Sequence, residues 1–208
     1  MSTCNGRQLG LLLSTYFLPM SEHNMNPKRQ LLIETALKLF YKHGVNSIGI
    51  NEVLKESGVA KRTLYNHFAS KEALLLAALE YRHQIFISWL EAEIQDAKSN
   101  SELIHCLFNA LQTWFDSKVE QLGEFRGCFF INTAAESATF ADEIKMFCLE
   151  HKLQVKALIG QYLKSTNNEL LDLICTLKEG AIVQSSLNPA ESHCTHNCIQ
   201  SLLKLTDN

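Results

Sequence analysis

Apolar residues recur along most of the chain three and four positions apart, the spacing that places them on one face of a helix. The two-residue alternation that indicates strands is missing over long stretches. Capping residues mark the boundaries. Asn26 and Pro27 suit the start of a helix, and Gly44 suits its end. Ser70 can cap the helix that follows it, and Ser99 with Glu102 forms a capping box. The pattern therefore predicts an all-α fold.

Further boundary signals divide the rest of the chain. Thr139 is placed to cap one helix, Thr166 with Glu169 forms a second capping box, and Asn188 with Pro189 suits the start of the last helix. We find no internal repeat and no long linker. About nine helices are expected, spanning approximately 27–44, 51–57, 61–68, 71–97, 99–118, 128–137, 139–164, 166–186 and 188–205.

Residues 44–71 contain two short amphipathic segments joined by a tight turn. In the first segment, 51–57, the apolar side chains of Val53 and Leu54 face inward. Gly58 follows at the position where a left-handed backbone ends a helix without steric cost. The segment predicts a pair of short helices.

The second short helix concentrates polar side chains within two turns. Leu64 and Phe68, four residues apart, form its packing face. Many of these polar side chains can contact phosphates or the edges of bases, and a single helix fits into the major groove of DNA. The alternative is an ordinary antiparallel helix pair with a solvated charged face. The polar residues of this helix are Lys61, Arg62, Thr63, Tyr65, Asn66 and His67.

The sequence SGVAKRTLYNHFASKEALLLA, from Ser57 to Ala77 with Gly44 upstream, resembles the N-terminal domain of TetR-type transcriptional regulators. The resemblance covers about residues 27–82; beyond it, only helical character and length agree. It implies an all-α protein with an N-terminal three-helix helix-turn-helix domain that binds DNA. A C-terminal helical domain would then bind a ligand and form the dimer.

The resemblance sets the expected domain boundaries. The DNA-binding domain would span 26–86, with the helix-turn-helix at 49–68, and the effector-binding and dimerisation domain would span 87–208. Residues 1–25 form an extension that we expect to be disordered or to follow from a misassigned start, with Met20 or Met25 as the true one. A partly helical arm packed on another subunit is the alternative.

The resemblance also implies which residues contact DNA. Thr63, Tyr65 and His67 stand at positions where the family touches DNA, and Lys71 is placed to hold a phosphate. Arg62 is a candidate for reading guanine through O6 and N7, because such positions vary within the family. The expected DNA-binding residues are Gly49, Lys61, Arg62, Thr63, Tyr65, Asn66, His67 and Lys71.

Three residues depart from the family pattern. Gly49 and Ala60 stand where the family often has a Ser or Thr that caps a helix, so both side-chain caps are lost. Leu54 replaces a usual Ala, which would hold the two helices slightly further apart. These departures change the expected phosphate contacts and leave the DNA-binding interpretation in place.

Charge is divided unevenly along the chain. The net formal charge is −3. Residues 26–72 carry eight Lys and Arg against four Asp and Glu, a net +4, whereas residues 73–208 carry ten against seventeen, a net −7. A basic N-terminal segment on an acidic body favours nucleic acid as the partner of the basic part.

The C-terminal part offers candidates for ligand binding and for dimerisation. Two apolar stripes near the end of the chain, around Ile174–Ile182 and Cys198–Leu203, suit either a dimer interface or the core of the chain itself. A small-molecule effector would need an apolar pocket, although each aromatic side chain could equally belong to the core. The candidate pocket residues are Phe86, Trp89, Phe108, Trp114, Phe115, Cys128, Phe129 and Phe130.

Seven cysteines, an odd number, argue against a disulfide framework. Cys128 follows Arg126 in a Gly-Cys-apolar motif that resembles one branch of the family, which includes sensors of electrophiles and oxidants. A small buried apolar residue is the alternative role for this cysteine. His193, Cys194, His196 and Cys198 lack a second ligand cluster, so no metal site is expected.

The chain has no P-loop, GxGxxG, nucleophile elbow or HExxH sequence, so neither an enzyme nor a cofactor is expected. The interpretation is a cytoplasmic homodimeric repressor that binds double-stranded DNA at a palindromic operator, has no membrane partner and is released by a small-molecule or thiol-reactive effector. One alternative is a regulator of the same fold that is controlled by a protein partner. The other is a helical interaction protein, or an enzyme of another type.

Overall fold

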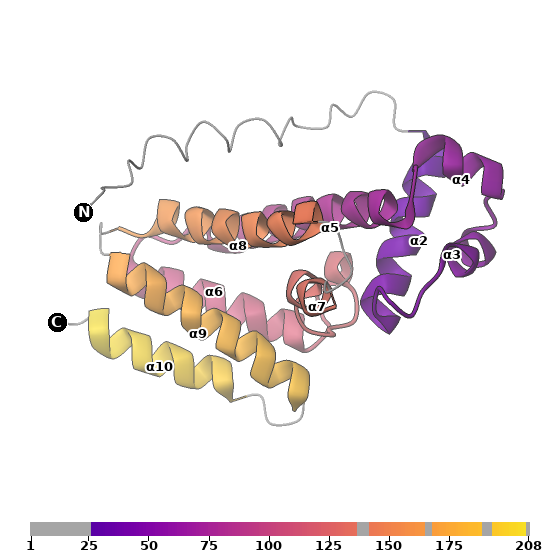
Figure 1. The fold of residues 1–208 in the computed structure, drawn as a ribbon. Helices are drawn as coiled ribbons and strands as arrows, with labels where there is room; N and C mark the ends of the chain where they lie inside the picture. The colour runs from indigo at the N-terminus through magenta and orange to yellow at the C-terminus, as the bar shows by residue number, and fades with distance from the viewer. Residues whose placement is uncertain (1–25, 137–141, 165–167, 189–192, 207–208) are drawn as a thin grey trace, which may run out of the picture.

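The computed structural model describes residues 26–136, 142–164, 168–188 and 193–206 (Figure 1). Within these residues the chain forms nine α-helices and one short 3₁₀ helix, and it contains no strand, which confirms the predicted fold class. In chain order the elements are α2 (Pro27–His43), α3 (Ile50–Ser57), α4 (Lys61–His67), α5 (Lys71–Ile94), α6 (Asn100–Phe115), η1 (Glu120–Leu122), α7 (Phe129–Ala135), α8 (Asp142–Tyr162), α9 (Asn168–Leu187) and α10 (Cys194–Thr206).

Helix starts in the N-terminal half follow the predicted caps. The Asn26 side chain accepts a hydrogen bond from the Lys28 N–H (3.0 Å), and the Ser70 and Ser99 hydroxyls accept from the N–H groups three residues ahead. Each cap satisfies a backbone donor that has no partner within its own helix. Gly44 ends α2 with φ +83°, a conformation that favours glycine.

Three predicted boundaries need correction. Helix α5 ends at Ile94 and α6 ends at Phe115, each about one turn earlier than predicted. At the end of α6, Ser117 takes a left-handed φ of +58° and its hydroxyl accepts a hydrogen bond from the Phe125 N–H (2.9 Å), which turns the chain. The last helix begins at Cys194, and His193 before it is not helical. The predicted caps Thr139 and Thr166, and the predicted start at Pro189, lie outside the described residues.

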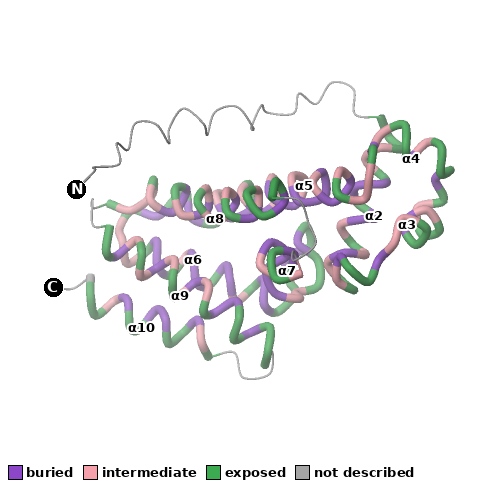
Figure 2. The backbone as a smooth tube through the Cα atoms, in the orientation of Figure 1, coloured by how far each residue is buried: buried purple, intermediate pink, exposed green. Residues whose placement is uncertain are grey.

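Helices α2, α3 and α4 gather at one end of the molecule, and the long helix α5 joins them to the remaining helices (Figure 1). Helix α5 is buried along most of its length, from Leu74 to Ile94, because α2 covers its first part and α6 and α8 cover the rest (Figure 2). Burial of each large apolar side chain contributes about 1.5–3 kcal/mol. The helix therefore serves as a rigid link between the two ends.

The two ends also meet directly through α2. The Tyr41 hydroxyl donates a hydrogen bond to the Gly127 carbonyl (2.8 Å) and accepts one from the Arg126 N–H (2.9 Å). On the other side of the Tyr41 ring lies the buried guanidinium of Arg82, 4.9 Å from the ring centroid. Arg82 in turn donates to the Leu122 carbonyl (2.8 Å). These bonds tie α2 to the turn before α7.

None of the described helices is long and apolar enough to cross a bilayer.

Candidate nucleic-acid interface

Helices α3 and α4 form the predicted pair joined by a tight turn. Gly58 ends α3 in a left-handed conformation with φ +66°, and a side chain there would be strained. The buried Val59 fills the space after the turn, and Val53 and Leu64 are fully buried beneath the two helices. Leu54 is only half-buried. Packing beneath the pair therefore leaves the opposite faces of α4 open.

The side chains of α4 that do not pack are polar and accessible. Lys61, Arg62, Tyr65 and Asn66 are exposed, with 48% of the Tyr65 surface accessible. Thr63 and His67 are half-buried on the flanks of the helix, and Leu64 faces the core. The structure thus brings all six polar residues predicted for this helix to one accessible element.

The start of α3 differs from a site built on a serine or threonine cap. The Gly49 N–H donates a hydrogen bond to the Glu52 carboxylate (3.0 Å). A Cβ on Gly49 would lie 2.8 Å from the same carboxylate oxygen, so a larger residue there would shift the end of the Glu52 side chain. This N–H can reach a phosphate only after Glu52 has moved away. Sequence reasoning missed the role of Glu52, although its position three residues after the cap is the signal for a capping box.

Lys71 also makes an internal contact. Its amine donates a hydrogen bond to the Val45 carbonyl (2.6 Å) and lies 5.9 Å from the centroid of the Phe40 ring. At the start of the same helix, the Glu72 carboxylate accepts hydrogen bonds from the Glu72 backbone N–H and from the Ser70 hydroxyl. These bonds lower the pKa of Glu72. A phosphate that binds here must compete with these neighbours, since an anion already occupies the positive end of the helix.

One further cation lies next to α4. The Arg29 guanidinium stacks over the Phe68 ring at 5.2 Å, so α2 contributes a positive charge beside the end of α4. Sequence reasoning missed Arg29 because only the packing of α2 against α4 brings the two residues together. Further along α2, Lys38 pairs with Glu56 of α3 (3.2 Å), and both side chains are exposed.

The residues predicted for the effector pocket lie in the core. All eight are buried, and five of them surround a hollow of about 10 Å³, room for about one water molecule: Phe86, Trp114, Cys128, Phe129 and Phe130. Trp89, Phe108 and Phe115 lie elsewhere in the same core, among the other aromatic rings. In this state the pocket is closed.

The lining of the hollow is mostly apolar but includes the charged residues Arg82, Lys152 and Lys178. The Nη2 atom of Arg82 and the Nε1 atom of Trp114 are buried there without a hydrogen-bond partner among the described residues. On the opposite side, the Lys152 amine donates to the Cys128 sulfur (3.2 Å) and to the Glu179 carboxylate (2.8 Å). Burial alone would raise the pKa of Glu179, but its contacts with Lys178 and Lys152 hold it below its ordinary value. The hollow is therefore rich in positive charge.

Two buried histidines cross between α5 and α8 beside the hollow. The Nδ1 atoms of His83 and His151 lie 2.9 Å apart, and the His151 ring stacks on Phe130 with centroids 3.5 Å apart. Only one of two facing Nδ1 atoms can carry a proton at this distance. Burial lowers the pKa of His83 to about 4, and burial together with Lys152 lowers that of His151 well below its ordinary value.

The two C-terminal apolar stripes are part of the chain's own core. Ile174, Ala181, Ile182 and Leu202 are buried against neighbouring helices, so their intrachain interpretation holds. The exposed large apolar residues lie on other faces: Met146, Leu149 and Leu153 of α8, Val183 and Leu187 of α9, and Leu205 of α10. Of the four candidate metal ligands, Cys194 lies 3.2 Å from the Ser185 hydroxyl and Cys198 is buried.

Comparison with known proteins agrees with this geometry. Residues 32–78 match the family model of bacterial regulatory proteins of the tetR family. An uncharacterised helix-turn-helix transcriptional regulator of Bacillus subtilis, YuxN, is 51% identical over 57 residues, which cover 27% of this chain and 20% of that protein. The chain thus matches about a fifth of the length of this relative.

Two further similarities extend over most of the chain. The transcriptional repressor NemR of Escherichia coli is 24% identical over 149 residues, covering 70% of this chain and 72% of that protein. The crystal structure of SCO4454, a TetR-family regulator from Streptomyces coelicolor, superposes with a TM-score of 0.73 at 24% identity, covering 85% of this chain and 94% of that chain. The comparisons and the accessible helix α4 agree: residues 32–78 match the tetR-family model, and most of the chain shares the fold of a TetR-family regulator.

Proposed function

We propose that the protein is a homodimeric repressor that binds a palindromic operator through α4. The observation that carries this proposal is the set of accessible polar side chains on α4, including Arg62, Tyr65 and Asn66, at one end of the molecule. Residues 26–86 form the proposed DNA-binding domain and residues 87–208 the proposed effector and dimerisation domain. Because the ligand is chromosomal DNA, we place its action in the cytoplasm.

The expected DNA contacts divide into two kinds. Lys61, Arg62 and Asn66 are exposed and long enough to reach base edges, so we assign them to sequence readout. Thr63 and His67 on the flanks, with Tyr65, would hold phosphates and fix the register of the helix. Gly49 and Lys71 would add phosphate contacts after Glu52 and the Val45 carbonyl release them.

A dimer follows from the need to read two half-sites. Half-sites one helical turn apart, about 34–36 Å, require two recognition helices related by a two-fold axis. The exposed apolar residues Val183 and Leu187 of α9, and Leu205 of α10, give these helices apolar surface for an interface. We therefore propose that α9 and α10 of each subunit form the dimer interface.

The hollow beneath α7 is the proposed effector site. A ligand that enlarges this hollow gains the unpaired Arg82 and Trp114 donors, so we propose an effector with an anionic or strongly accepting group. Binding would favour the domain arrangement that does not fit the operator. The alternative trigger is an electrophile that alkylates Cys128, whose sulfur accepts the hydrogen bond from Lys152.

The test is an electrophoretic mobility shift with the intergenic DNA upstream of the protein's own gene. We expect specific retardation that a scrambled duplex of the same length does not give. Absence of specific retardation would contradict the proposal. If the thiol is the trigger, N-ethylmaleimide should release DNA from the wild-type complex and not from the Cys128→Ser complex; release from neither would contradict the thiol trigger.

A further inference from the structure

The hollow of about 10 Å³ beneath α7 is lined by two residues that carry hydrogen-bond donors the fold itself does not use. Arg82 and Trp114 both line the hollow, and both are almost completely buried. The Nη2 atom of Arg82 and the Nε1 atom of Trp114 have no hydrogen-bond partner among the described residues. Leaving buried donors unpaired is costly, so a small acceptor is expected beside them.

Positive charge around the hollow exceeds negative charge. Three cationic side chains line it, those of Arg82, Lys152 and Lys178. Both lysines pair with the same carboxylate, that of Glu179. In the described part of the chain Arg82 pairs with no carboxylate and donates instead to the Leu122 carbonyl. Three cations against one carboxylate leave excess positive charge in the core, where an unpaired charge is costly.

The three cations surround a common space. Burial first, and then the charges of Lys152, His83, Lys178 and Arg82, lower the pKa of His151, which also lines the hollow. Because all three cations act on this one ring, their positive fields overlap there. The His151 ring is neutral near pH 7, so it does not add to the positive charge and does not balance it.

The size of the hollow limits what can occupy it. It has room for about one water molecule. Carboxylate, sulfate and phosphate groups are several atoms wide, whereas a monatomic anion such as chloride takes little more space than water. A water molecule can accept from the two donors but leaves the positive charge unbalanced. A monatomic anion satisfies the donors and balances the charge.

We propose that the hollow binds a single chloride-sized anion. The ion would accept hydrogen bonds from Nη2 of Arg82 and Nε1 of Trp114, and it would lie beside the two lysine ammonium groups. An ammonium has three donors. Among the described residues Lys152 directs two of them to Cys128 and Glu179, so a third N–H is left for the ion.

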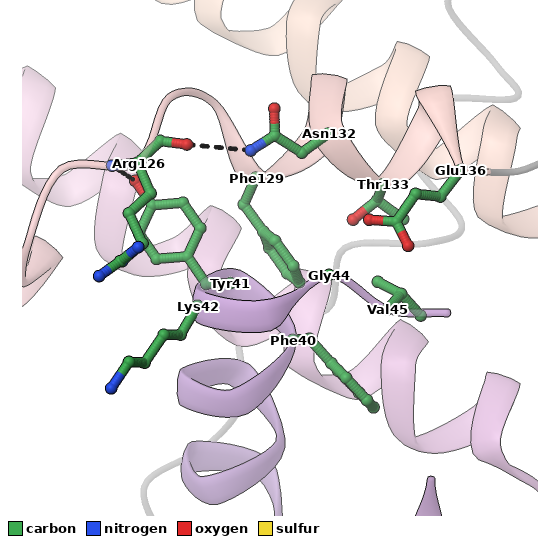
Figure 3. A pocket seen from close by; sticks show the side chains of 10 residues that line it. All are labelled: Phe40, Tyr41, Lys42, Gly44, Val45, Arg126, Phe129, Asn132, Thr133 and Glu136. Atoms are coloured by element: carbon green, nitrogen blue, oxygen red, sulfur yellow. Dashed lines mark hydrogen bonds between the residues drawn. The ribbon is translucent and has the colours of Figure 1, made fainter. Parts of the chain in front are cut away.

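Phe129 provides a route between the hollow and solvent. This residue lines both the hollow and a larger, partly open cavity of about 280 Å³ between α2 and α7 (Figure 3). Movement of this one ring would join the two spaces, so the ion can exchange while the core stays folded. A larger anionic effector would enter the same way and displace the ion. That consequence rests on the proposed function, whereas binding of the ion does not.

Bromide is the probe, because it resembles chloride in size and charge and quenches tryptophan fluorescence on contact. The chain has two tryptophans, Trp89 and Trp114, and both are buried, so bromide in solvent should quench them weakly. The full chain without DNA is titrated with sodium bromide, and sodium gluconate keeps the ionic strength constant. Quenching should saturate, with half-saturation in the millimolar range, and chloride should reverse it.

Quenching that rises linearly with bromide, or that chloride does not reverse, would overturn the proposal. The titration contains no DNA, so failure of the protein to bind an operator would contradict only the proposed function.

Two lysine variants locate the ion. Lys178→Met removes one cation from the lining and should weaken bromide binding about tenfold, while Glu179 keeps its pair with Lys152. Lys156→Met is the matched control, because Lys156 also pairs with a carboxylate of α9, that of Asp172, and does not line the hollow. The control should bind bromide as the wild type does. Equal affinity of Lys178→Met and the wild type would overturn the assignment.

Diffraction supplies a measurement that needs no variant. Crystals of the full chain grown in sodium bromide should show an anomalous peak within hydrogen-bond distance of Arg82 and Trp114. Absence of a peak there would overturn the proposal even if the quenching saturates, because the bromide would then bind elsewhere.

Discussion

The recognition helix α4 and the aromatic core beneath α7 carry the two groups of residues expected to bind ligands, and the fold treats them in opposite ways. The polar residues of α4, such as Arg62 and Tyr65, face solvent. The aromatic residues of the core, such as Phe108 and Trp114, are buried almost completely. The proposed DNA-binding surface is accessible in the free protein, whereas the proposed effector site is a hollow of about 10 Å³ enclosed by core side chains.

This contrast separates binding from stability in the two regions. Side chains on α4 have few packing contacts, so replacing them should change DNA affinity and leave folding nearly intact. Core aromatics have the reverse property, because their contacts hold the molecule together whether or not a ligand binds. A variant of α4 that loses both DNA affinity and folding stability would contradict this distinction between the two regions.

The largest effect is expected in the core. Phe108→Ala should lower the free energy of unfolding by about 3–5 kcal/mol, because it removes a fully buried ring and leaves a cavity. Tyr65→Ala, the surface control, should change it by about 0.5 kcal/mol or less while weakening operator binding. Urea denaturation followed by circular dichroism measures both. A large stability loss for Tyr65→Ala would mean that α4 belongs to the core.

The next largest effect concerns the buried histidine pair. The ordinary histidine pKa is 6.5, and burial lowers the pKa of His83 to about 4. Between these two pH values His83 is protonated in the unfolded chain and neutral in the folded chain. Stability should therefore be full above pH 6.5 and fall as the pH drops toward 4. The expected slope is up to about 1.4 kcal/mol per pH unit for each histidine.

The cationic groups that face His151 act in the same direction, whereas a hydrogen bond with the Gln154 side chain raises the pKa of His83. Lys152, Lys178 and Arg82 also lower the pKa of His151, after burial itself. Urea midpoints measured from pH 7.5 to 4.5 should move steadily downward in the wild type, and less in His83→Phe, which removes one titrating ring. An equal decline in both proteins would show that carboxylates dominate the acid sensitivity.

The sequence was most informative where local chemistry decides the structure. Asn26, Ser70 and Ser99 cap helices as predicted, and Gly58 makes the turn between α3 and α4. Each depends on residues within a few positions, so pattern and propensity are sufficient.

Features made by distant parts of the chain could not be predicted. The Lys71 amine binds the carbonyl of Val45, 26 residues away, and Asn46 binds Glu136, 90 residues away. Glu136 also lines the cavity of about 280 Å³ between α2 and α7 (Figure 3), which no local pattern indicates. The core aromatics were recognisable as apolar, but whether they leave space depends on how the helices pack.

A smaller change in DNA affinity should show whether Arg62 of α4 recognises a base or only binds a phosphate. Arg62→Ala should cost about 1–3 kcal/mol on the preferred operator and less on other sequences, if the guanidinium pairs with a guanine. Binding to a set of operators that differ at one base pair measures the change. Lys55→Ala, an exposed residue on α3, is the matched charge control. Equal losses on operator and random DNA would make Arg62 a phosphate contact.

The smallest expected effect shows whether the Lys71 amine binds DNA or only stabilises the folded protein. Its amine bonds to the Val45 carbonyl in the free protein, yet an ammonium has three donors, so one bond leaves others for a phosphate. If it also binds DNA, Lys71→Met should weaken binding to every sequence and lower the salt slope by about one unit. The methionine keeps an apolar stem beside Phe40, which limits the loss of packing.

If the amine only stabilises the folded protein, Lys71→Met should lower the free energy of unfolding by about 1 kcal/mol and keep the wild-type salt slope. Plots of binding constant against salt, for operator and random duplexes, separate these outcomes.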